Sequence, residues 1–247
     1  MKKQVVPYKN QKENKKKQVR QMFDGISKDY DLLNRVISGG IDVRWRKNVV
    51  SYLVPEKPKK ILDIATGTAD LAIELTKTNA EEIVGLDISP GMLEIGKQKV
   101  ASKGMDKVIK MVIGDSEKLD YNDAYFDAIT VAFGVRNFEN LDKGLQEINR
   151  VLRPGGNLVI LETAVPTSFP MKQFYGFYTQ KVLPILGSLF SKDKAAYRYL
   201  SDSAAAFPFG KVFNNILLKN GFIEVKDFPQ TLGVASIYCA KKPNWPL

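Results

Sequence analysis

Histidine is absent from the 247 residues, and this absence removes several classes of enzyme. Ser-His-Asp and Cys-His hydrolases need an imidazole, as do zinc sites built on histidine and reactions with a histidine general base. Proton transfer must therefore depend on Asp, Glu, Tyr or Lys side chains, or on water that they hold. We predict no metal site.

Cysteine and long apolar runs are also scarce. The single cysteine, Cys239, excludes an intramolecular disulfide and is typical of a reducing cytoplasm. The apolar stretches have the length of strands and are broken by charges, which argues against a membrane-spanning helix. The first twenty residues lack the apolar centre of a secretory signal. The sequence therefore predicts a cytoplasmic protein, with peripheral attachment to the inner face of the membrane left open.

Acidic residues are rare at the N-terminus. Residues 1–20 hold eight Lys or Arg against one Glu, so most of the formal charge of +10 belongs to this segment. We predict a basic, flexible tail over residues 1–18 and a single domain over residues 19–247. A solvated terminus, attraction to an anionic membrane and attraction to nucleic acid are the three interpretations of the tail.

From residue 60 onward, short apolar strands alternate with helical segments. Five strands are expected in segments 59–65, 81–89, 106–115, 126–134 and 157–164, and two more within segment 222–242. This alternation predicts an α/β fold, a doubly wound and mostly parallel sheet covered by helices on both faces. A helical cap is expected over residues 19–58, and a helical insert over residues 165–210 follows the fifth strand.

The segment "ILDIATGTAD", residues 61–70, ends a strand with one glycine where nucleotide-binding turns usually have two or three. Gly67 permits close backbone approach or a positive φ, and the alanines near it keep the turn tight. Ligands in doubly wound sheets bind outside the carboxyl ends of the strands. Three consecutive strands end in carboxylates there, at Asp63, Asp87 and Asp115.

These acidic residues predict an adenosine-bearing cofactor, although the loop alone is also compatible with an ordinary βα turn. Asp87 follows Gly67 by twenty residues and suits a ribose diol, and Asp115-Ser116 suits the adenine amino group. Asp63 and Asp70 would repel a pyrophosphate but attract the sulfonium and ammonium groups of S-adenosylmethionine. The sequence therefore favours S-adenosylmethionine over NAD.

Five motifs occur in an order that resembles the class I S-adenosylmethionine-dependent methyltransferases: "LDIATGTAD", "VGLDISPGML", "GDSEKL", "FDAITVAFGVRNF" and "INRVLRPGGNLVILE". Three further segments, "MFDGISKDYDLLNRVISGGIDVRWRK", "FGVRNF" and "YRYLSDSAAAFP", are similar to the menaquinone/ubiquinone biosynthesis C-methyltransferases over roughly residues 19–240. The resemblance implies a Rossmann-like, seven-stranded sheet. It also implies methylation of a ring carbon of a polyprenylated quinol, first of all demethylmenaquinol to menaquinol. A ubiquinone precursor, 2-polyprenyl-6-methoxy-1,4-benzoquinol, is the alternative.

The resemblance also implies particular contacts. Thr68, Asp87, Asp115 and Ser116 fall on the family's cofactor positions. The chain departs from the family in two places: its loop has Thr-Gly-Thr-Ala for Gly-Gly-Thr-Gly, and Asp42 stands where many relatives have histidine.

Methylation of a quinol carbon needs a base and a group that stabilises a phenolate. Arg136 and Asn137, just beyond the fourth strand, are expected to hold the oxyanion and a hydroxyl. Arginine stays protonated in proteins, so the candidates for proton acceptor or orienting group are Tyr30, Asp31 and Asp42.

The insert contains an aromatic and apolar segment, residues 169–190, with Lys172 and Lys181 as its only charges. We expect either a buried helix pair broken at Pro184, or a surface that lines a channel for a prenyl tail or enters the membrane interface. Two rival functions are a non-catalytic lipid-binding module and an RNA methyltransferase that uses the basic tail. Nucleic acid is the less favoured partner because the charge is confined to the terminus. A homodimer is left open.

Overall fold

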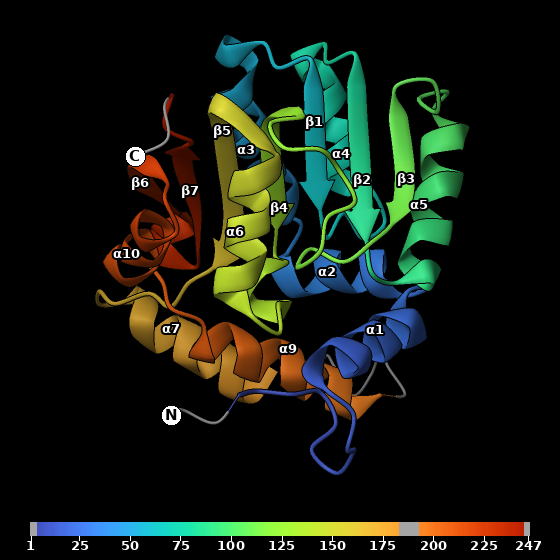
Figure 1. Cartoon of the computed structure of the whole chain (residues 1–247). Coiled ribbons are helices and arrows are strands. Elements are labelled where there is room, and N and C mark those ends of the chain that lie inside the picture. Colours follow the sequence, from blue (N-terminus) through green and yellow to red (C-terminus); the bar gives the residue numbers. More distant parts are fainter. Residues whose placement is uncertain (1–3, 183–192, 245–247) are drawn as a thin grey trace.

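A computed structural model describes residues 4–182 and 193–244, and a seven-stranded sheet forms its centre (Figure 1). The strand order is β3-β2-β1-β4-β5-β7-β6, and β7 alone runs antiparallel to its neighbours. The predicted doubly wound, mostly parallel sheet is confirmed. The strands are β1 (Lys60–Ile64), β2 (Glu82–Asp87), β3 (Ile109–Ile113), β4 (Phe126–Ala132), β5 (Leu152–Thr163), β6 (Ile223–Gln230) and β7 (Ala235–Lys241).

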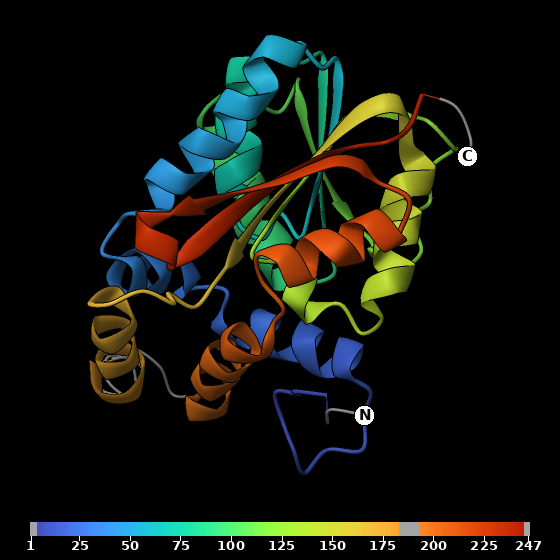
Figure 2. The same ribbon diagram turned by 90° about the vertical axis from the view of Figure 1, so that its left-hand side faces the viewer.

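Helices cover both faces of the sheet, which explains why its central strands β1 and β2 are buried along nearly their whole length (Figure 2). One face packs against α3 (Asp42–Leu53), α4 (Asp70–Leu75) and α5 (Pro90–Ser102), and their buried side chains form one apolar cluster with the strands. The other face packs against α6 (Leu141–Val151) and α10 (Lys211–Lys219) in a second cluster.

The cap and the insert meet at the carboxyl ends of the parallel strands, along the lower edge of Figure 1. The cap contributes α1 (Lys15–Ile26) and α2 (Tyr30–Ser38). The insert contributes α7 (Met171–Phe177), one π-helical turn (η4, Tyr178–Val182) and α9 (Lys194–Ala206). Because this edge is where doubly wound sheets bind ligands, the cap and insert enclose the expected site. Pro184 and the rest of segment 183–190 lie outside the described residues.

The N-terminal boundary differs from the prediction. Helix α1 begins at Lys15, so residues 15–18 of the predicted tail are helical, and the Asn14 side chain caps them by accepting from Lys17 N. Lys15 is buried, and Lys16 pairs with acidic side chains of the core domain. Of the six basic residues that the structure describes between residues 4 and 20, these two therefore point inward. The division into a tail and one domain otherwise stays a prediction.

Strand β5 is also longer than expected, because it begins at Leu152 and not at residue 157. Leu152 pairs with Phe126, and the register then shifts by the time Asn157 pairs with Ala128. An irregular register of this kind accommodates a proline within a strand, here Pro154. Among the described residues, no helix combines the length and apolar character needed to cross a membrane.

Candidate active site

In the loop after β1, two alanines adopt the left-handed backbone conformation that glycine usually adopts. Gly67 has φ +56°, and Ala65 and Ala69 have φ +55° and +69°. Left-handed alanine costs about 1 kcal/mol, so such strain persists only where the surroundings hold it, as they often do at functional sites. A Cβ on Gly134, in the loop after β4, would lie 2.6 Å from Ala65 Cβ. The two loops therefore approach each other so closely that only glycine fits at residue 134.

Asp87 lies beside this loop at the end of β2, with 7% of its surface exposed. Its two carboxylate oxygens accept hydrogen bonds from Gly67 N and Ser89 N, each at 2.8 Å. Burial raises the pKa of Asp87 to about 6, although these backbone donors oppose the shift. Each oxygen has a second lone pair, so the carboxylate can still accept from a ribose hydroxyl.

Asp115 and Ser116 line the same cleft from the loop after β3, together with Gly67 and Asp87. The cleft, together with the open solvent at its mouth, spans about 680 Å³. Lys16 of α1 reaches across to Asp115 and to Glu117, with Nζ to carboxylate oxygen distances of 2.7 and 3.1 Å. Glu139 also lines the cleft. Acidic groups outnumber the one lysine, which suits a positively charged ligand.

Asp63 and Thr68, also predicted to bind cofactor, are placed differently. The buried Asp63 carboxylate accepts from Thr66 Oγ1 at 2.6 Å and Thr130 Oγ1 at 2.7 Å, beneath the loop. Burial raises the pKa of Asp63 to about 6. Thr68 donates to Asp31 Oδ1 at 2.5 Å. Neither residue is among those that line the cleft in the described structure, and their contact with cofactor stays a prediction.

The turn η3 (Val135–Asn137) after β4 carries the predicted Arg136 and Asn137. The Arg136 side chain is 8% exposed, and its Nη1 pairs with the fully buried Glu162 at the end of β5. Burial alone would lower the pKa of Arg136, but the Glu162 carboxylate raises it above its usual value. The guanidinium therefore remains charged and serves as a donor to an oxyanion.

Two further elements hold this turn. Lys15 of α1 donates to the carbonyl oxygens of Arg136 and Phe138 at 2.8 and 2.9 Å, and burial lowers its pKa to about 8. Tyr199 of α9 donates to Asn137 Oδ1 at 3.0 Å. The cap and the insert thus both contact the predicted catalytic turn.

A second cavity, an open groove that spans about 1680 Å³ with the solvent at its mouth, lies next to the cofactor cleft. Arg136 lines the groove, and Tyr30 and Phe133 line both cavities, so these two rings form the wall between them. Burial raises the pKa of Tyr30, which favours the neutral phenol. The apolar and aromatic lining comes from the cap, the insert and the β6–β7 turn, and includes Ile37, Ile41, Trp45, Met171, Phe174, Tyr175, Tyr178, Leu200 and Val234.

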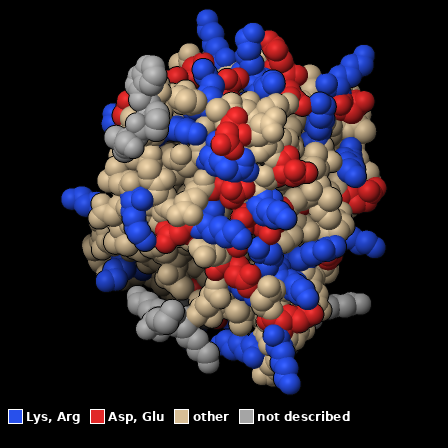
Figure 3. Space-filling view, viewed as in Figure 1, with Lys and Arg blue, Asp and Glu red and all other residues tan. Residues whose placement is uncertain are grey.

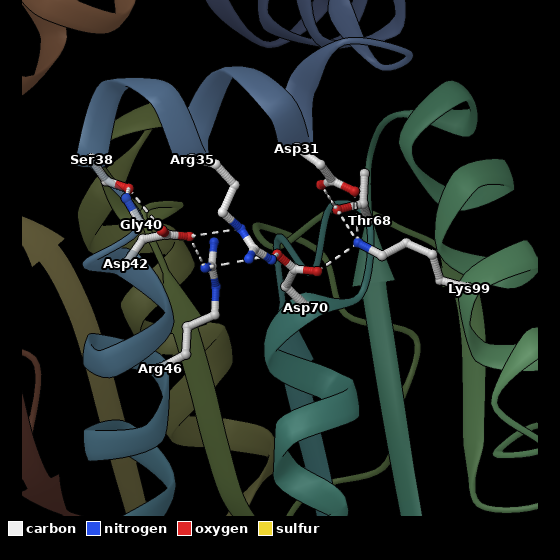
Figure 4. A network of polar contacts seen from close by, with 9 residues as sticks. All are labelled: Asp31, Arg35, Ser38, Gly40, Asp42, Arg46, Thr68, Asp70 and Lys99. Carbon is white, nitrogen blue, oxygen red and sulfur yellow. Dashed lines mark hydrogen bonds and ion pairs between the residues drawn. The ribbon is translucent and has the colours of Figure 1, made fainter.

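Asp42 also lines the groove, but its carboxylate belongs to a charge network (Figure 4). It accepts from Ser38 Oγ at 2.7 Å and forms an ion pair with Arg46. The network continues through Asp70 and Lys99, and it joins α2, α3, α4 and α5 around the cofactor loop. Asp42 thus links α2 to α3, and its role as a proton acceptor or orienting group stays a prediction.

Lys99 is the point where this network meets the cofactor loop. Its Nζ lies 2.7 Å from Asp31, 2.5 Å from Asp70 and 3.2 Å from Thr68 Oγ1. We expect Lys99→Met to lower the free energy of unfolding by about 1–2 kcal/mol, because Asp31 loses its ion pair with Lys99 and Asp70 loses the shortest of its ion pairs while it keeps Arg35 and Arg46. Lys110→Met removes the exposed pair with Glu82 and is the control, with no measurable change expected. Urea unfolding of both variants measures the difference; equal midpoints would contradict this role.

A family model described as the ubiE/COQ5 methyltransferase family matches residues 9–242. The chain belongs to this family. A demethylmenaquinone methyltransferase from Bacteroides fragilis is 46% identical over 239 residues, 96% of this chain and 97% of that protein. The ubiquinone/menaquinone biosynthesis C-methyltransferase UbiE from Geobacter sulfurreducens is 41% identical, over 92% of this chain and 90% of that protein.

Solved structures agree on the fold of this ubiE/COQ5 family member. A S-adenosylmethionine-dependent methyltransferase from Thermotoga maritima superposes with a TM-score of 0.64 at 17% identity, covering 90% of this chain and 99% of that one. The predicted cofactor, S-adenosylmethionine, is thereby confirmed at the level of the family. The acidic cleft and the carboxylate beside Gly67 fit this cofactor.

Sequence reasoning missed three side chains at this methyltransferase site: Lys15, Lys16 and Glu162. The lysines were counted with the basic tail, and nothing in their spacing indicates an inward direction. Glu162 did carry a signal, because it ends a parallel strand as Asp63 and Asp87 do. Among residues 4–182 and 193–244, no cluster of His, Cys, Asp and Glu side chains is arranged to hold a metal ion.

Proposed function

We propose that this methyltransferase methylates a ring carbon of a polyprenylated quinol, converting demethylmenaquinol to menaquinol. The observation that carries the proposal is the shared wall of Tyr30 and Phe133 between an acidic cleft and an apolar groove. A charged methyl donor and an aromatic acceptor in these two cavities would meet at that wall. Transfer in line across a short distance derives much of its rate from such positioning.

The groove suits a substrate with a flat ring and an isoprenoid chain. Most of its lining is apolar or aromatic, and Arg136 supplies a fixed positive charge. The names of the relatives from Bacteroides fragilis and Geobacter sulfurreducens support a quinone precursor.

S-adenosylmethionine, when bound, supplies an electrophilic methyl group on a sulfonium. The chain itself must place the quinol and raise the electron density of its ring carbon. Arg136, which lines the groove, stabilises the phenolate oxygen. Asn137 accepts from Tyr199, donates to the Phe133 carbonyl and lines the cofactor cleft, so its predicted contact with a quinol hydroxyl is not part of this proposal. Asp87 holds the ribose, and Lys15 keeps the η3 turn at the cleft. The enclosing cap and insert exclude water from the phenolate.

Methyl-labelled S-adenosylmethionine and reduced, demethylated quinol lipids test the proposal. Labelled menaquinol should form from demethylmenaquinol, and mass spectrometry should place the methyl group on a ring carbon. Label on an oxygen, or no transfer to any quinol, would overturn it. A benzoquinol precursor is the second candidate, favoured by the name of the Geobacter sulfurreducens relative, and comparison of kcat/KM for the two quinols decides between them.

Helix α7 supports a second proposal, peripheral contact with an anionic membrane. Phe169, Phe174 and Phe177 are 81%, 65% and 64% exposed, with Lys172 and Lys181 also exposed between and beyond them. Phe174 also lines the groove, so this patch adjoins the groove's wall. Aromatic and lysine side chains are suited to the lipid interface, where a quinol lipid resides. Elsewhere, on the face in Figure 3, basic and acidic side chains are interspersed, which argues against a nucleic-acid surface.

We therefore expect Phe177→Asp to reduce binding to anionic vesicles at least threefold in flotation assays, and added salt to weaken binding by the wild type. Leu218→Asp, at an exposed leucine of α10, is the matched control and should bind as the wild type does. If both variants float with the vesicles to the same extent, α7 does not contact the membrane.

A further inference from the structure

Glu162 holds its two carboxylate oxygens in unequal environments. Oε1 accepts from Arg136 Nη1, from Thr163 N at 2.7 Å and from Thr163 Oγ1 at 3.0 Å. Oε2 is buried and has no hydrogen-bond partner in the described structure, and the same is true of Arg136 Nε. One ion pair thus presents an unpaired acceptor and an unpaired donor. A hydroxyl group can satisfy both, because it accepts and donates.

The pair lies at the wall of the substrate groove. Arg136 and Thr163 line the groove, and Glu162 is fully buried between β5 neighbours directly behind them. Glu162 itself is not among the residues that line the groove in the described structure, so a ring hydroxyl held by Arg136 would reach Oε2 through one water or after a small shift of the Arg136 or Thr163 side chain. Leaving a buried carboxylate oxygen unpaired is costly, so we expect a water or a ligand hydroxyl to donate to Oε2.

The other titratable groups around the pair are Lys15, which donates to the Arg136 carbonyl, and four tyrosines. Tyr199 of α9 and Tyr238 of β7 face Glu162, while Tyr30 and Tyr175 face Arg136. Burial raises the pKa of each of these tyrosines above its usual value. They therefore stay protonated near neutral pH and are poor proton acceptors. Glu162 is the carboxylate among these groups, and its Oε2 is the acceptor that has no hydrogen-bond partner among the described residues.

We propose that Glu162 is the general base that takes the proton from the quinol hydroxyl. The proposal rests on the proposed function. Proton transfer from the hydroxyl to Oε2 leaves a phenolate on Arg136, and the ring carbon then forms its bond to the methyl group as the methyl–sulfur bond breaks. The ring proton is lost to water, and the methylated phenolate recovers its proton from Glu162. One proton is released for each methyl group transferred.

Glu162→Gln tests this role because glutamine keeps the shape and can still accept from Arg136. We expect kcat to fall at least a hundredfold, with KM for the quinol and the dissociation constant for S-adenosylmethionine changed less than threefold. The residual rate should rise about tenfold per pH unit toward the pKa of the quinol, because the hydroxyl must then ionise unaided. Glu162→Asp should restore part of kcat and the wild-type pH profile. Glu147→Gln, which removes a carboxylate paired with Arg150, should leave the profile unchanged.

A second measurement uses the wild type and does not depend on whether the variant folds. If an enzyme group is the base, the pH at which kcat rises should stay the same for a chlorinated quinol with a more acidic hydroxyl. A rise that moves with the acidity of the substrate, or a kcat for Glu162→Gln within tenfold of the wild type, would overturn the role of Glu162. If the wild type methylates no quinol, the proposed function fails and this inference with it, so the two failures are distinguishable.

Discussion

Arg136→Met should lower kcat by about a hundredfold or more while the affinity for S-adenosylmethionine changes less than threefold. The guanidinium is 8% exposed at the wall of the groove, where a phenolate would develop, and methionine fills similar space without a donor. A group that acts on charge in the transition state affects kcat and kcat/KM together. Steady-state kinetics and calorimetry separate this result from a defect in cofactor binding.

The same substitution should also cost stability, for a separable reason. Without Arg136, the buried Glu162 charge loses its partner, and such losses cost about 3–5 kcal/mol. The double variant Arg136→Met/Glu162→Gln removes the unpaired charge and should regain most of this stability without regaining activity. Arg150→Met, a more exposed arginine, should retain wild-type kcat. Activity that returns with stability would show that Arg136 has only a structural role.

The alternation of strands and helices was sufficient to predict the sheet, because strands buried on both faces have mostly apolar residues between their ends. The predicted ends of strands and helices were less accurate where a local sequence signal conflicts with the tertiary pairing. Pro154 and the glycines after it indicated a stop before the fifth strand, but pairing of Leu152 with Phe126 extends β5 past them. Asn14 likewise starts α1 earlier than the basic run suggested.

Site residues could be predicted where a general rule gives the position of a residue in the fold from its position in the sequence. Carboxylates at the ends of parallel strands do lie at one edge, and four predicted cofactor residues line one cleft: Gly67, Asp87, Asp115 and Ser116. Which side chains meet from distant segments was not predictable. The pairs Arg136–Glu162 and Lys16–Asp115 depend on how helices of the cap and turns of the sheet pack together.

Asp87→Asn should weaken S-adenosylmethionine binding by roughly ten- to a hundredfold at pH 7.5, the range for lost hydrogen bonds to a charged group. The affinity of the wild type should also depend on pH. Burial raises the pKa of Asp87 to about 6, so the carboxyl gains a proton as the pH falls below this value. The neutral form accepts ribose hydroxyls less strongly and does not attract a sulfonium, so the dissociation constant should rise toward low pH.

Asp63 also has a pKa of about 6, and the two carboxyls must be separated. If Asp87 contacts the ribose, Asp87→Asn should flatten the pH dependence between pH 5 and 7.5, whereas Asp63→Asn should keep it. Calorimetric titration of each folded variant across this range provides the test. If the pH dependence of cofactor affinity disappears in Asp63→Asn and remains in Asp87→Asn, it is caused by Asp63 beneath the loop and not by Asp87. Cofactor affinity would then depend on how firmly Thr66 and Thr130 hold that loop through Asp63.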